Sequence, residues 1–251
     1  MMQERRAIDL NCDIGEELDD AVDAALFPLI SSASIACGGH AGSPRSMAVS
    51  VGRAVAHGVV IGAHLSYPDR DGFGRSEVEM PVEVLVGVLS QQALALRDIA
   101  ERAGGRVAYV KPHGALYHAA TASARIAGAV LAVADGLGDA TRIVGMPGGE
   151  VAAAAGARFT PEGFPERGYR SAQSLQPRSA AGAIVEDPRD VAGRAVAMAR
   201  GEAVRLVDGA PVRVDVRTLC IHSDHPYALV NALAVRAALA EAGIDVRAVS
   251  D

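Results

Sequence analysis

A lysine and a histidine stand two residues apart in the segment V-K-P-H-G, residues 110–114. Lys111 and His113 follow a short apolar run at residues 107–110, which is typical of a buried strand. The strand would carry a cation and an imidazole to its C-terminal end. A lysine there can stabilise developing negative charge, and a histidine can transfer protons. Tyr117 adds a phenol in the helix-like segment that follows.

Four other predicted strands also end in polar side chains. They cover residues 7–12, 32–37, 59–63 and 218–221. Because ligands of parallel α/β folds bind outside the carboxyl ends of the strands, we expect these polar residues to converge on one rim. The residues at these ends are Asn11, Asp13 and Glu16, then His40, then His64, and finally His222 and Asp224.

Such a rim suits two kinds of hydrolytic chemistry. Neutral histidines and an aspartate can bind a divalent metal that activates water. The metal-ligand candidates are Asp13, His40, His64 and His113. Without a metal, Asp13 or His113 can act as a general base while Lys111 stabilises an oxyanion. Each residue also has a structural alternative, since Asp13 can cap a turn and Lys111 can extend to solvent. The sequence contains no H-E-x-x-H, G-x-S-x-G or Walker A motif.

The elements that must position these residues alternate along the chain. A strand, a polar loop and a helix follow one another at least six times, which favours an α/β fold with a parallel sheet. We expect one domain over residues 1–251, built as a closed or nearly closed barrel. A doubly wound open sheet is the alternative.

Several boundaries follow from local signals. Ser43 and Pro44 are expected to begin a helix and Gly58 to end it. Strands are predicted at residues 142–146 and 157–160, and one helix before the first of them. A hairpin is expected around residues 208–209. The loop at residues 65–76 is long, as functional lids often are, and Arg70 is its candidate site residue.

Composition narrows the classes of protein. Half of the residues are hydrophobic and the formal net charge is −6, with no basic cluster that would suggest nucleic-acid binding. The three cysteines form no C-x-x-C pair, which argues against a disulfide framework or a structural zinc site. No apolar run reaches the ~18 residues of a membrane span, and the first residues lack a signal-peptide core. We expect a cytoplasmic protein, and the sequence leaves open whether it forms a homo-oligomer.

Seven segments together resemble one family, the LamB/YcsF family, to which the A subunit of bacterial 5-oxoprolinase belongs. They run in the family's order and cover nearly the whole chain. The matching segments are D-L-N-C-D-I-G-E (9–16), S-S-A-S-I-A-C-G-G-H-A-G (31–42), G-V-V-I-G-A-H (58–64), P-D-R-D-G-F-G-R (68–75), V-K-P-H-G-A-L-Y (110–117), R-G-Y (167–169) and L-Q-P-R-S-A-A-G-A (175–183).

The resemblance implies a distorted, TIM-like (β/α) barrel of the seven-stranded glycosidase/deacetylase type. It also implies ATP-dependent opening of the 5-oxoproline lactam to L-glutamate, together with separate B and C subunits. ATP, expected with Mg²⁺, would then be used by the complex, because this chain lacks a nucleotide-binding loop. We take Asp13, Lys111 and His113 as catalytic candidates. The substrate-binding candidates are Asn11, Glu16, His40, His64, Arg70, Tyr117, Arg170, Arg178, His222 and Asp224.

Within this assignment, Arg170 or Arg178 could clamp the substrate carboxylate through a bidentate fork. Three positions depart from the family pattern: Gly39 replaces a bulky aromatic residue, Glu166 replaces aspartate, and residues 222–225 replace a glycine-rich version. We expect Gly39 to enlarge the pocket beside His40. Two alternatives stay open. One is a metal-dependent deacetylase or amidohydrolase acting on a sugar or amide, and the other is a non-catalytic subunit that binds a small ligand.

Overall fold

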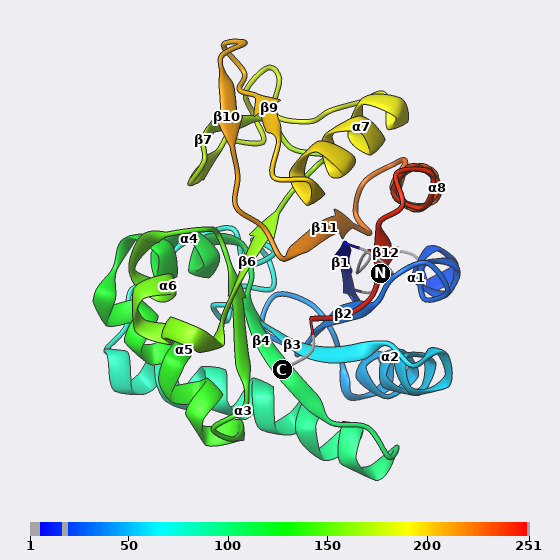
Figure 1. Cartoon of the computed structure of the whole chain (residues 1–251). Coiled ribbons are helices and arrows are strands. Elements are labelled where there is room, and N and C mark those ends of the chain that lie inside the picture. Colours follow the sequence, from blue (N-terminus) through cyan, green and yellow to red (C-terminus); the bar gives the residue numbers. More distant parts are fainter. Residues whose placement is uncertain (1–5, 17–19, 250–251) are drawn as a thin grey trace.

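Seven parallel strands form a closed barrel in the computed structural model, which describes residues 6–16 and 20–249. Each strand pairs with its neighbour in the chain, and the last pairs back onto the first (Figure 1). This confirms the predicted seven-stranded barrel and excludes the open doubly wound sheet. In barrel order, the strands are β1 (Ala7–Ile14), β2 (Ser32–Ala36), β3 (Val60–Leu65), β4 (Val107–Pro112), β5 (Arg142–Gly145), β6 (Phe159–Gly163) and β11 (Thr218–His222).

Helices alternate with the strands, and most of them cover the outside of the barrel (Figure 1). They are α1 (Asp20–Leu26), α2 (Pro44–His57), α3 (Val82–Arg102), α4 (Gly114–Ala122), α5 (Ala124–Leu137), α6 (Gly149–Ala155), the short 3-10 helix η1 (Gly156–Arg158), α7 (Pro188–Ala199) and α8 (Ala228–Glu241). Ser43 caps α2 by accepting a bond from the Ser46 amide, and Gly58 ends it at φ 65°, as predicted. Within the described residues, no single helix is long and apolar enough to cross a membrane, although the sharply bent pair α4 and α5 meets that test together.

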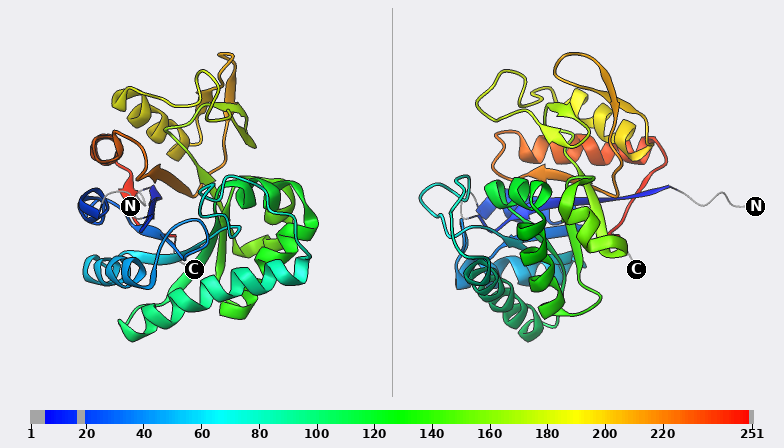
Figure 2. Two further views of the ribbon diagram at one scale, coloured as in Figure 1. Left: turned by 180° about the vertical axis from the view of Figure 1, so that it is seen from behind. Right: turned by 90° about the vertical axis from the view of Figure 1, so that its left-hand side faces the viewer.

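A long segment between β6 and β11 forms a separate group of elements on one side of the barrel. It holds the antiparallel pair β7 (Tyr169–Ser171) and β8 (Ser174–Leu175), helix α7, and the antiparallel hairpin β9 (Ala203–Arg205) and β10 (Pro211–Arg213). Figure 2 shows this group together in both views. The hairpin around residues 208–209 is therefore confirmed. A short strand, β12 (Asp245–Val246), pairs with the start of β1.

Several predicted strand ends differ from the structure by one or two residues; the first strand, predicted over 7–12, continues to Ile14. Three further differences are larger or matter more for the site. The third strand was predicted to stop before His64, but β3 runs through it to Leu65. The sixth strand covers 159–163 instead of 157–160, because residues 156–158 form a 3-10 turn. The helix after β4 is two helices, since the Ser123 side chain accepts a bond from the Ile126 amide and caps α5. The shift of β6 places Glu162 inside a barrel strand.

The barrel interior is polar on the face of β1 that carries Asp9, Asn11 and Asp13. These three residues alternate with apolar ones, so they share one side of the strand. Asn11 Nδ2 donates to Thr218 Oγ1 on β11 at 2.7 Å and to Glu162 Oε1 on β6 at 2.9 Å. Because β11 lies between β1 and β6 in the barrel wall, Asn11 can reach Glu162 only through the interior. This polar side of β1 therefore faces inward.

Gly62 on β3 leaves room for the buried ring of Tyr109. A Cβ atom at position 62 would overlap that ring, and the Tyr109 hydroxyl is already hydrogen-bonded to Ser34 at 3.1 Å. We expect Gly62→Ala to lower the free energy of unfolding by about 1–3 kcal/mol, measured by urea denaturation. Gly52→Ala is the matched control, because among the described residues no atom outside its helix lies within 4 Å of the added Cβ. In a helix interior, alanine is favoured over glycine by roughly 0.5–1 kcal/mol. If Gly62→Ala and Gly52→Ala had equal free energies of unfolding, the close packing of the Tyr109 ring against Gly62 would be contradicted.

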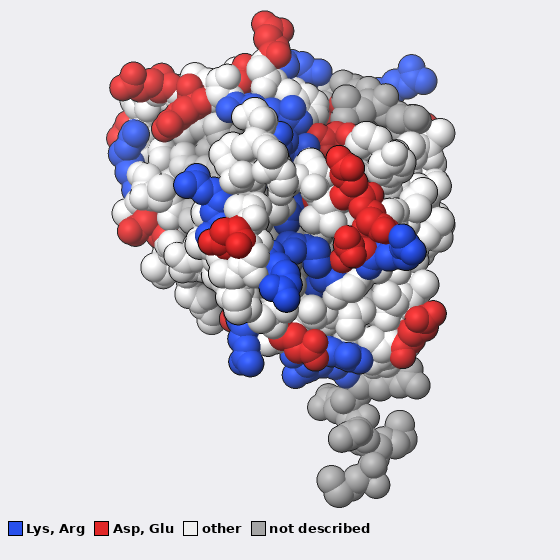
Figure 3. All heavy atoms as spheres, turned by 90° about the horizontal axis from the view of Figure 1, so that it is seen from above, with Lys and Arg blue, Asp and Glu red and all other residues white. Residues whose placement is uncertain are grey.

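Surface charge is mixed on the face shown in Figure 3. Among the described residues there, basic and acidic side chains are interspersed. This matches the modest net charge of −6 in the sequence.

Candidate functional site

A cavity of about 470 Å³ opens at the C-terminal ends of the barrel strands. Its floor includes side chains from β1, β3, β4 and β11, and its wall comes from residues 164–178 and from the loop after β3. The structure thus brings together residues that are far apart in the sequence. The polar and charged lining residues are Asp13, His64, Arg75, Lys111, His113, Tyr117, His118, Arg167, Gln176, Arg178 and His222.

Lys111 lies at the floor of this cavity between two carboxylates. Its Nζ is 2.8 Å from Asp13 Oδ1 and 2.7 Å from Glu162 Oε1. Only 2% of the residue is exposed, so the alternative of a lysine that extends to solvent is wrong. Burial alone would lower the pKa of Lys111, but Asp13, Cys220 and Glu162 outweigh it and raise that pKa well above its ordinary value. The ammonium is therefore a fixed positive charge.

Asp13 is the ionised partner of this lysine and also approaches His64. Burial would raise the pKa of its carboxyl, but His64 and Lys111 hold that pKa well below the ordinary range. Asp13 Oδ2 is 3.4 Å from His64 Nε2. A carboxylate with so low a pKa is a weak proton acceptor. Its geometry suits the orientation of Lys111 and His64 better than the role of general base.

Two buried glutamates that support the site were not among the predicted site residues. Glu162 accepts bonds from Asn11 and from the Tyr117 hydroxyl, the latter at 3.1 Å. Glu166 Oε2 accepts from the His222 amide at 2.9 Å and lies 3.2 Å from His222 Nδ1. Both glutamates are fully buried. The predicted end of the sixth strand at residue 160 concealed Glu162, which lies in the barrel interior beside Asn11 and Lys111.

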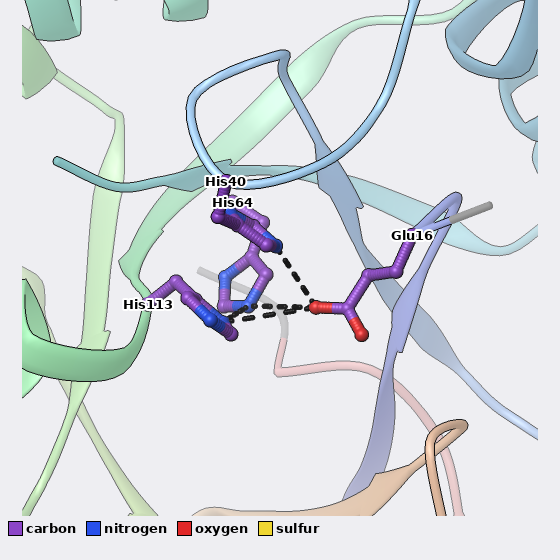
Figure 4. A group of neighbouring side chains, drawn as sticks. All are labelled: Glu16, His40, His64 and His113. Atoms are coloured by element: carbon purple, nitrogen blue, oxygen red, sulfur yellow. Dashed lines mark hydrogen bonds and ion pairs between the residues drawn. The ribbon is translucent and has the colours of Figure 1, made fainter. Parts of the chain in front are cut away.

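Glu16, His40, His64 and His113 form a cluster that borders the cavity through its two histidines His64 and His113, here called the histidine cluster (Figure 4). Glu16 Oε1 lies 2.9 Å from His40 Nε2, 3.9 Å from His64 Nε2 and 3.7 Å from His113 Nδ1. The His40 and His113 rings stack with centroids 3.7 Å apart. The four residues come from the ends of β1, β2, β3 and β4, so neighbouring strands assemble the cluster.

Electrostatics keeps two of these imidazoles neutral. Burial, and then the neighbouring His64, lower the pKa of His113 to about 3. Burial, followed by His113 and His64, moves the pKa of His40 far below its ordinary value. Burial and the Asp13 carboxylate raise the pKa of Glu16 well above its ordinary value. Neutral imidazoles beside a carboxyl are the ligand types that divalent transition metals use.

A second group of residues that could bind a metal consists of Asp13, Cys220 and His222. This group already holds a positive charge. Lys111 Nζ already lies among its atoms, 2.8 Å from Asp13 Oδ1 and 3.2 Å from Cys220 Sγ. A bound cation there would have to displace an ammonium. Burial and the Asp13 charge also raise the pKa of the Cys220 thiol, which disfavours the thiolate that a metal needs. The histidine cluster is the better candidate to hold a metal.

Three arginines also line the cavity. Arg75 and Arg178 share one oxygen of Asp224, Oδ2, at 3.0 and 3.3 Å. They reach it from the loop after β3 and from the segment after β8, so Asp224 holds two separate loops together. Arg167 completes this arginine rim and is mostly buried. The cavity therefore presents several positive charges to a ligand.

Comparison with known proteins relates the whole described barrel to one family. The LamB/YcsF family model matches residues 8–251. This chain belongs to the LamB/YcsF family. Within that family, the A subunit of 5-oxoprolinase from Heliobacterium modesticaldum is 42% identical over 247 residues, covering 96% of this chain and 97% of that protein. The resemblance seen in the sequence is therefore confirmed.

Solved structures agree with this membership. The lactam utilization protein from Thermus thermophilus is 40% identical and superposes with a TM-score of 0.90, covering 97% of this chain and 100% of that one. A family 4 carbohydrate esterase from Streptomyces lividans, in complex with acetate, reaches a TM-score of 0.53 at 12% identity, over 97% of this chain and 93% of that one. The second likeness shows the fold alone. It supports the deacetylase-type barrel predicted for this LamB/YcsF protein.

The remaining predicted site residues of this LamB/YcsF protein lie in varied places. Arg178 lines the cavity, whereas Arg170 is exposed on β7 and is not among the lining residues. Arg70 donates to the carbonyl oxygens of Gly38 and Gly42, at 3.2 and 2.8 Å, and so braces the loop that carries His40. Asn11 lies beneath the floor, bonded to Glu162. The structure thus separates the two arginines that the sequence left as alternatives.

Two departures from the family pattern have structural consequences. A Cβ at Gly39 would lie 2.5 Å from Ser66 Oγ and 2.7 Å from Gln92 Oε1. The expectation that Gly39 enlarges the pocket beside His40 is wrong, because Gln92 fills this space and is bonded to the Ser66 backbone. Glu166 also accepts from Asn231 at 2.7 Å, so it joins the end of β11 to α8. The shorter side chain of aspartate would not span both partners.

Proposed function

We propose that this protein is the lactam-opening subunit of an ATP-dependent 5-oxoprolinase, which converts 5-oxoproline to L-glutamate together with B and C subunits. The observation that carries the proposal is the buried Lys111 ammonium at the floor of a cavity rimmed by arginines. Such a cavity suits a small substrate with a carboxylate and an amide oxygen. The names of the two similar family members, a lactam utilization protein and the A subunit of 5-oxoprolinase, support this choice.

The cavity offers a partner for each part of the reaction. The arginine rim binds the substrate carboxylate, with Arg178 able to do so through two parallel bonds. Lys111 faces the lactam oxygen and stabilises the negative charge that develops when water adds to the carbonyl carbon. The histidine cluster supplies the polar atoms that position this water. The ring C–N bond then breaks, the nitrogen takes a proton, and L-glutamate forms.

ATP coupling is assigned to the partner subunits. The chain has no Walker A loop, and an unactivated lactam resists attack by water. Transfer of a phosphoryl group from ATP to the amide oxygen, with Mg²⁺ bound to the nucleotide, would release ADP and make the ring carbon more electrophilic. Addition of water and cleavage of the C–N bond would then leave an acyl phosphate, which a second water hydrolyses to L-glutamate and phosphate. The positive floor and rim of the cavity suit the more negative activated lactam as well as 5-oxoproline itself.

Reconstitution tests the proposal directly. Release of phosphate from ATP and formation of L-glutamate are measured with B and C subunits, 5-oxoproline and Mg·ATP, with and without this chain. We expect glutamate formation only when this chain is present. Omission of 5-oxoproline is the control for uncoupled ATP hydrolysis. Glutamate formation that does not depend on this chain would refute the proposal.

A second candidate function is a metal-dependent deacetylase or amidohydrolase, and the histidine cluster favours it. This candidate predicts that the isolated chain cleaves acetylated sugars or simple amides without ATP. Assays of the isolated chain with acetylated sugars and simple amides, without ATP, separate the two functions, because only the second candidate predicts turnover. Binding of 5-oxoproline without turnover in any mixture would instead favour a ligand-binding role.

A further inference from the structure

Hydrogen bonds to the backbone define which nitrogen of two histidines carries hydrogen. His64 Nδ1 lies 3.1 Å from the carbonyl oxygen of Lys111, and His113 Nε2 lies 3.0 Å from that of Phe73. A carbonyl oxygen only accepts, so each of these nitrogens must be the N–H donor. In neutral rings, His64 Nε2 and His113 Nδ1 then carry lone pairs.

These two lone-pair nitrogens face each other at 3.0 Å. His64 Nε2 is also 3.4 Å from Asp13 Oδ2, and both nitrogens lie within 3.9 Å of Glu16 Oε1. With both rings neutral, no hydrogen lies between these two nitrogens, and the Asp13 and Glu16 oxygens lie close to them. Such a contact repels unless a positive charge lies between the atoms.

We propose that this charge is a divalent transition metal, held by Glu16 Oε1, His40 Nε2, His64 Nε2 and His113 Nδ1. One extra proton would relieve only the contact between His64 Nε2 and His113 Nδ1, whereas a metal would also bind Glu16 Oε1 and His40 Nε2, which lie 2.9 Å apart. The bonds from His64 and His113 to carbonyl oxygens also match metal-binding histidines, whose other N–H is held by an acceptor that orients the ring.

Spacing supports this assignment. The four ligand atoms lie within 4.8 Å of one another, and the shortest separations are 2.9 and 3.0 Å. Ligands about 2.0–2.1 Å from a tetrahedral zinc lie about 3.3 Å apart, so small side-chain shifts would complete the site. Three imidazoles and one carboxylate favour Zn²⁺, Co²⁺ or Mn²⁺, because Mg²⁺ and Ca²⁺ prefer oxygen ligands. This metal is therefore distinct from the Mg²⁺ that accompanies ATP.

The site borders the reaction cavity. His64 and His113 line that cavity, so the metal would face the substrate. When bound, a metal of this kind polarises a carbonyl and lowers the pKa of water. Its presence does not depend on the proposed function, but its role in lactam opening does.

Metal content and affinity test this inference on the full-length chain. The protein is treated with a chelator, dialysed, and titrated with Zn²⁺, Co²⁺, Mn²⁺ and Mg²⁺, while elemental analysis gives the metal-to-protein ratio. We expect one equivalent of a transition metal, a visible absorption band with Co²⁺, and no comparable binding of Mg²⁺. Absence of stoichiometric binding for every transition ion in correctly folded protein would overturn the proposal.

Two variants remove a ligand and keep the structural bond. His64→Asn leaves an amide N–H near the Lys111 carbonyl oxygen but removes the ligand atom Nε2. His113→Gln leaves an amide N–H near the Phe73 carbonyl oxygen but removes the ligand atom Nδ1. Each should weaken metal binding by more than about 10–100-fold, the loss caused by removing a partner that only orients a ligand. His57→Gln, at the end of α2, is the control for binding by surface histidines. Unchanged affinity in both cluster variants would also overturn the proposal.

The outcome is separable from that of the lactam assay, because metal binding is measured without substrate. A chain that binds metal but does not support glutamate formation refutes the proposed function alone. A fully active chain that binds no transition metal refutes the metal site alone.

Discussion

Replacement of Lys111 by methionine is expected to lower the turnover of the reconstituted enzyme by about 10²–10³-fold, the loss seen when one donor to a developing oxyanion is removed. The expected cause is loss of the positive charge at the cavity floor, where Lys111 contacts Asp13 and Glu162. Turnover is measured as L-glutamate formed at saturating 5-oxoproline and ATP. The apparent KM should change less than kcat, because the charge acts on the transition state.

Stability is the competing explanation for such a loss. Lys111→Met leaves two carboxylates buried without their cation, and breaking a buried pair in this way costs about 3–5 kcal/mol. The double variant Lys111→Met with Glu162→Gln removes one charge of each sign. It should recover most of the free energy of unfolding, measured in urea, but not the turnover. Recovery of both quantities would show that Lys111 serves only the fold.

The location of the site was predictable because parallel strands expose their carboxyl ends at one rim. His64 and Lys111 each follow a short apolar run, and these runs are strands of the barrel. Asp13 lies near the end of a strand in which polar and apolar residues alternate. A polar side chain at the end of an otherwise apolar strand is therefore a strong signal. The same reasoning explains why the barrel itself was predictable from alternation of strands and helices.

The pairing of charges was not predictable in the same way. Asp13 and Lys111 are 98 positions apart, and Asn11 and Glu162 are 151 apart, so only strand order brings them together. Glu162 was missed because the predicted sixth strand ended at residue 160, whereas β6 continues to Gly163. A boundary error of this size moves a residue from the barrel interior to a loop, which changes its chemistry completely.

Loops were the least predictable part of the site. The effect of Gly39 depended on Gln92, a residue of α3 whose side chain reaches the loop after β2. Nothing local to Gly39 indicates that contact. Similarly, the choice between Arg170 and Arg178 depends on how β7 and β8 turn, and the sequence contains no signal for that direction.

Arg178 and Arg170 now form a matched pair for the second large prediction. Arg178 lines the cavity and lies 3.3 Å from Asp224 Oδ2, whereas Arg170 is exposed outside the cavity. Arg178→Met is expected to raise the KM for 5-oxoproline by about 10–100-fold, since a hydrogen bond to a charged group contributes about 1.5–3 kcal/mol. The kcat should fall less, because the carboxylate is bound equally in the ground and transition states.

Arg170→Met should leave both constants near those of the unmodified chain, because Arg170 is exposed and is not among the residues that line the cavity. For both variants, KM and kcat are measured from initial rates of glutamate formation over a range of 5-oxoproline concentrations. If Arg170→Met raises KM and Arg178→Met does not, the carboxylate binds outside the cavity. The position of Arg178 beside Asp224 gives a further check. Asp224→Asn removes the carboxylate that holds both Arg75 and Arg178, so it should raise KM in the same direction as Arg178→Met.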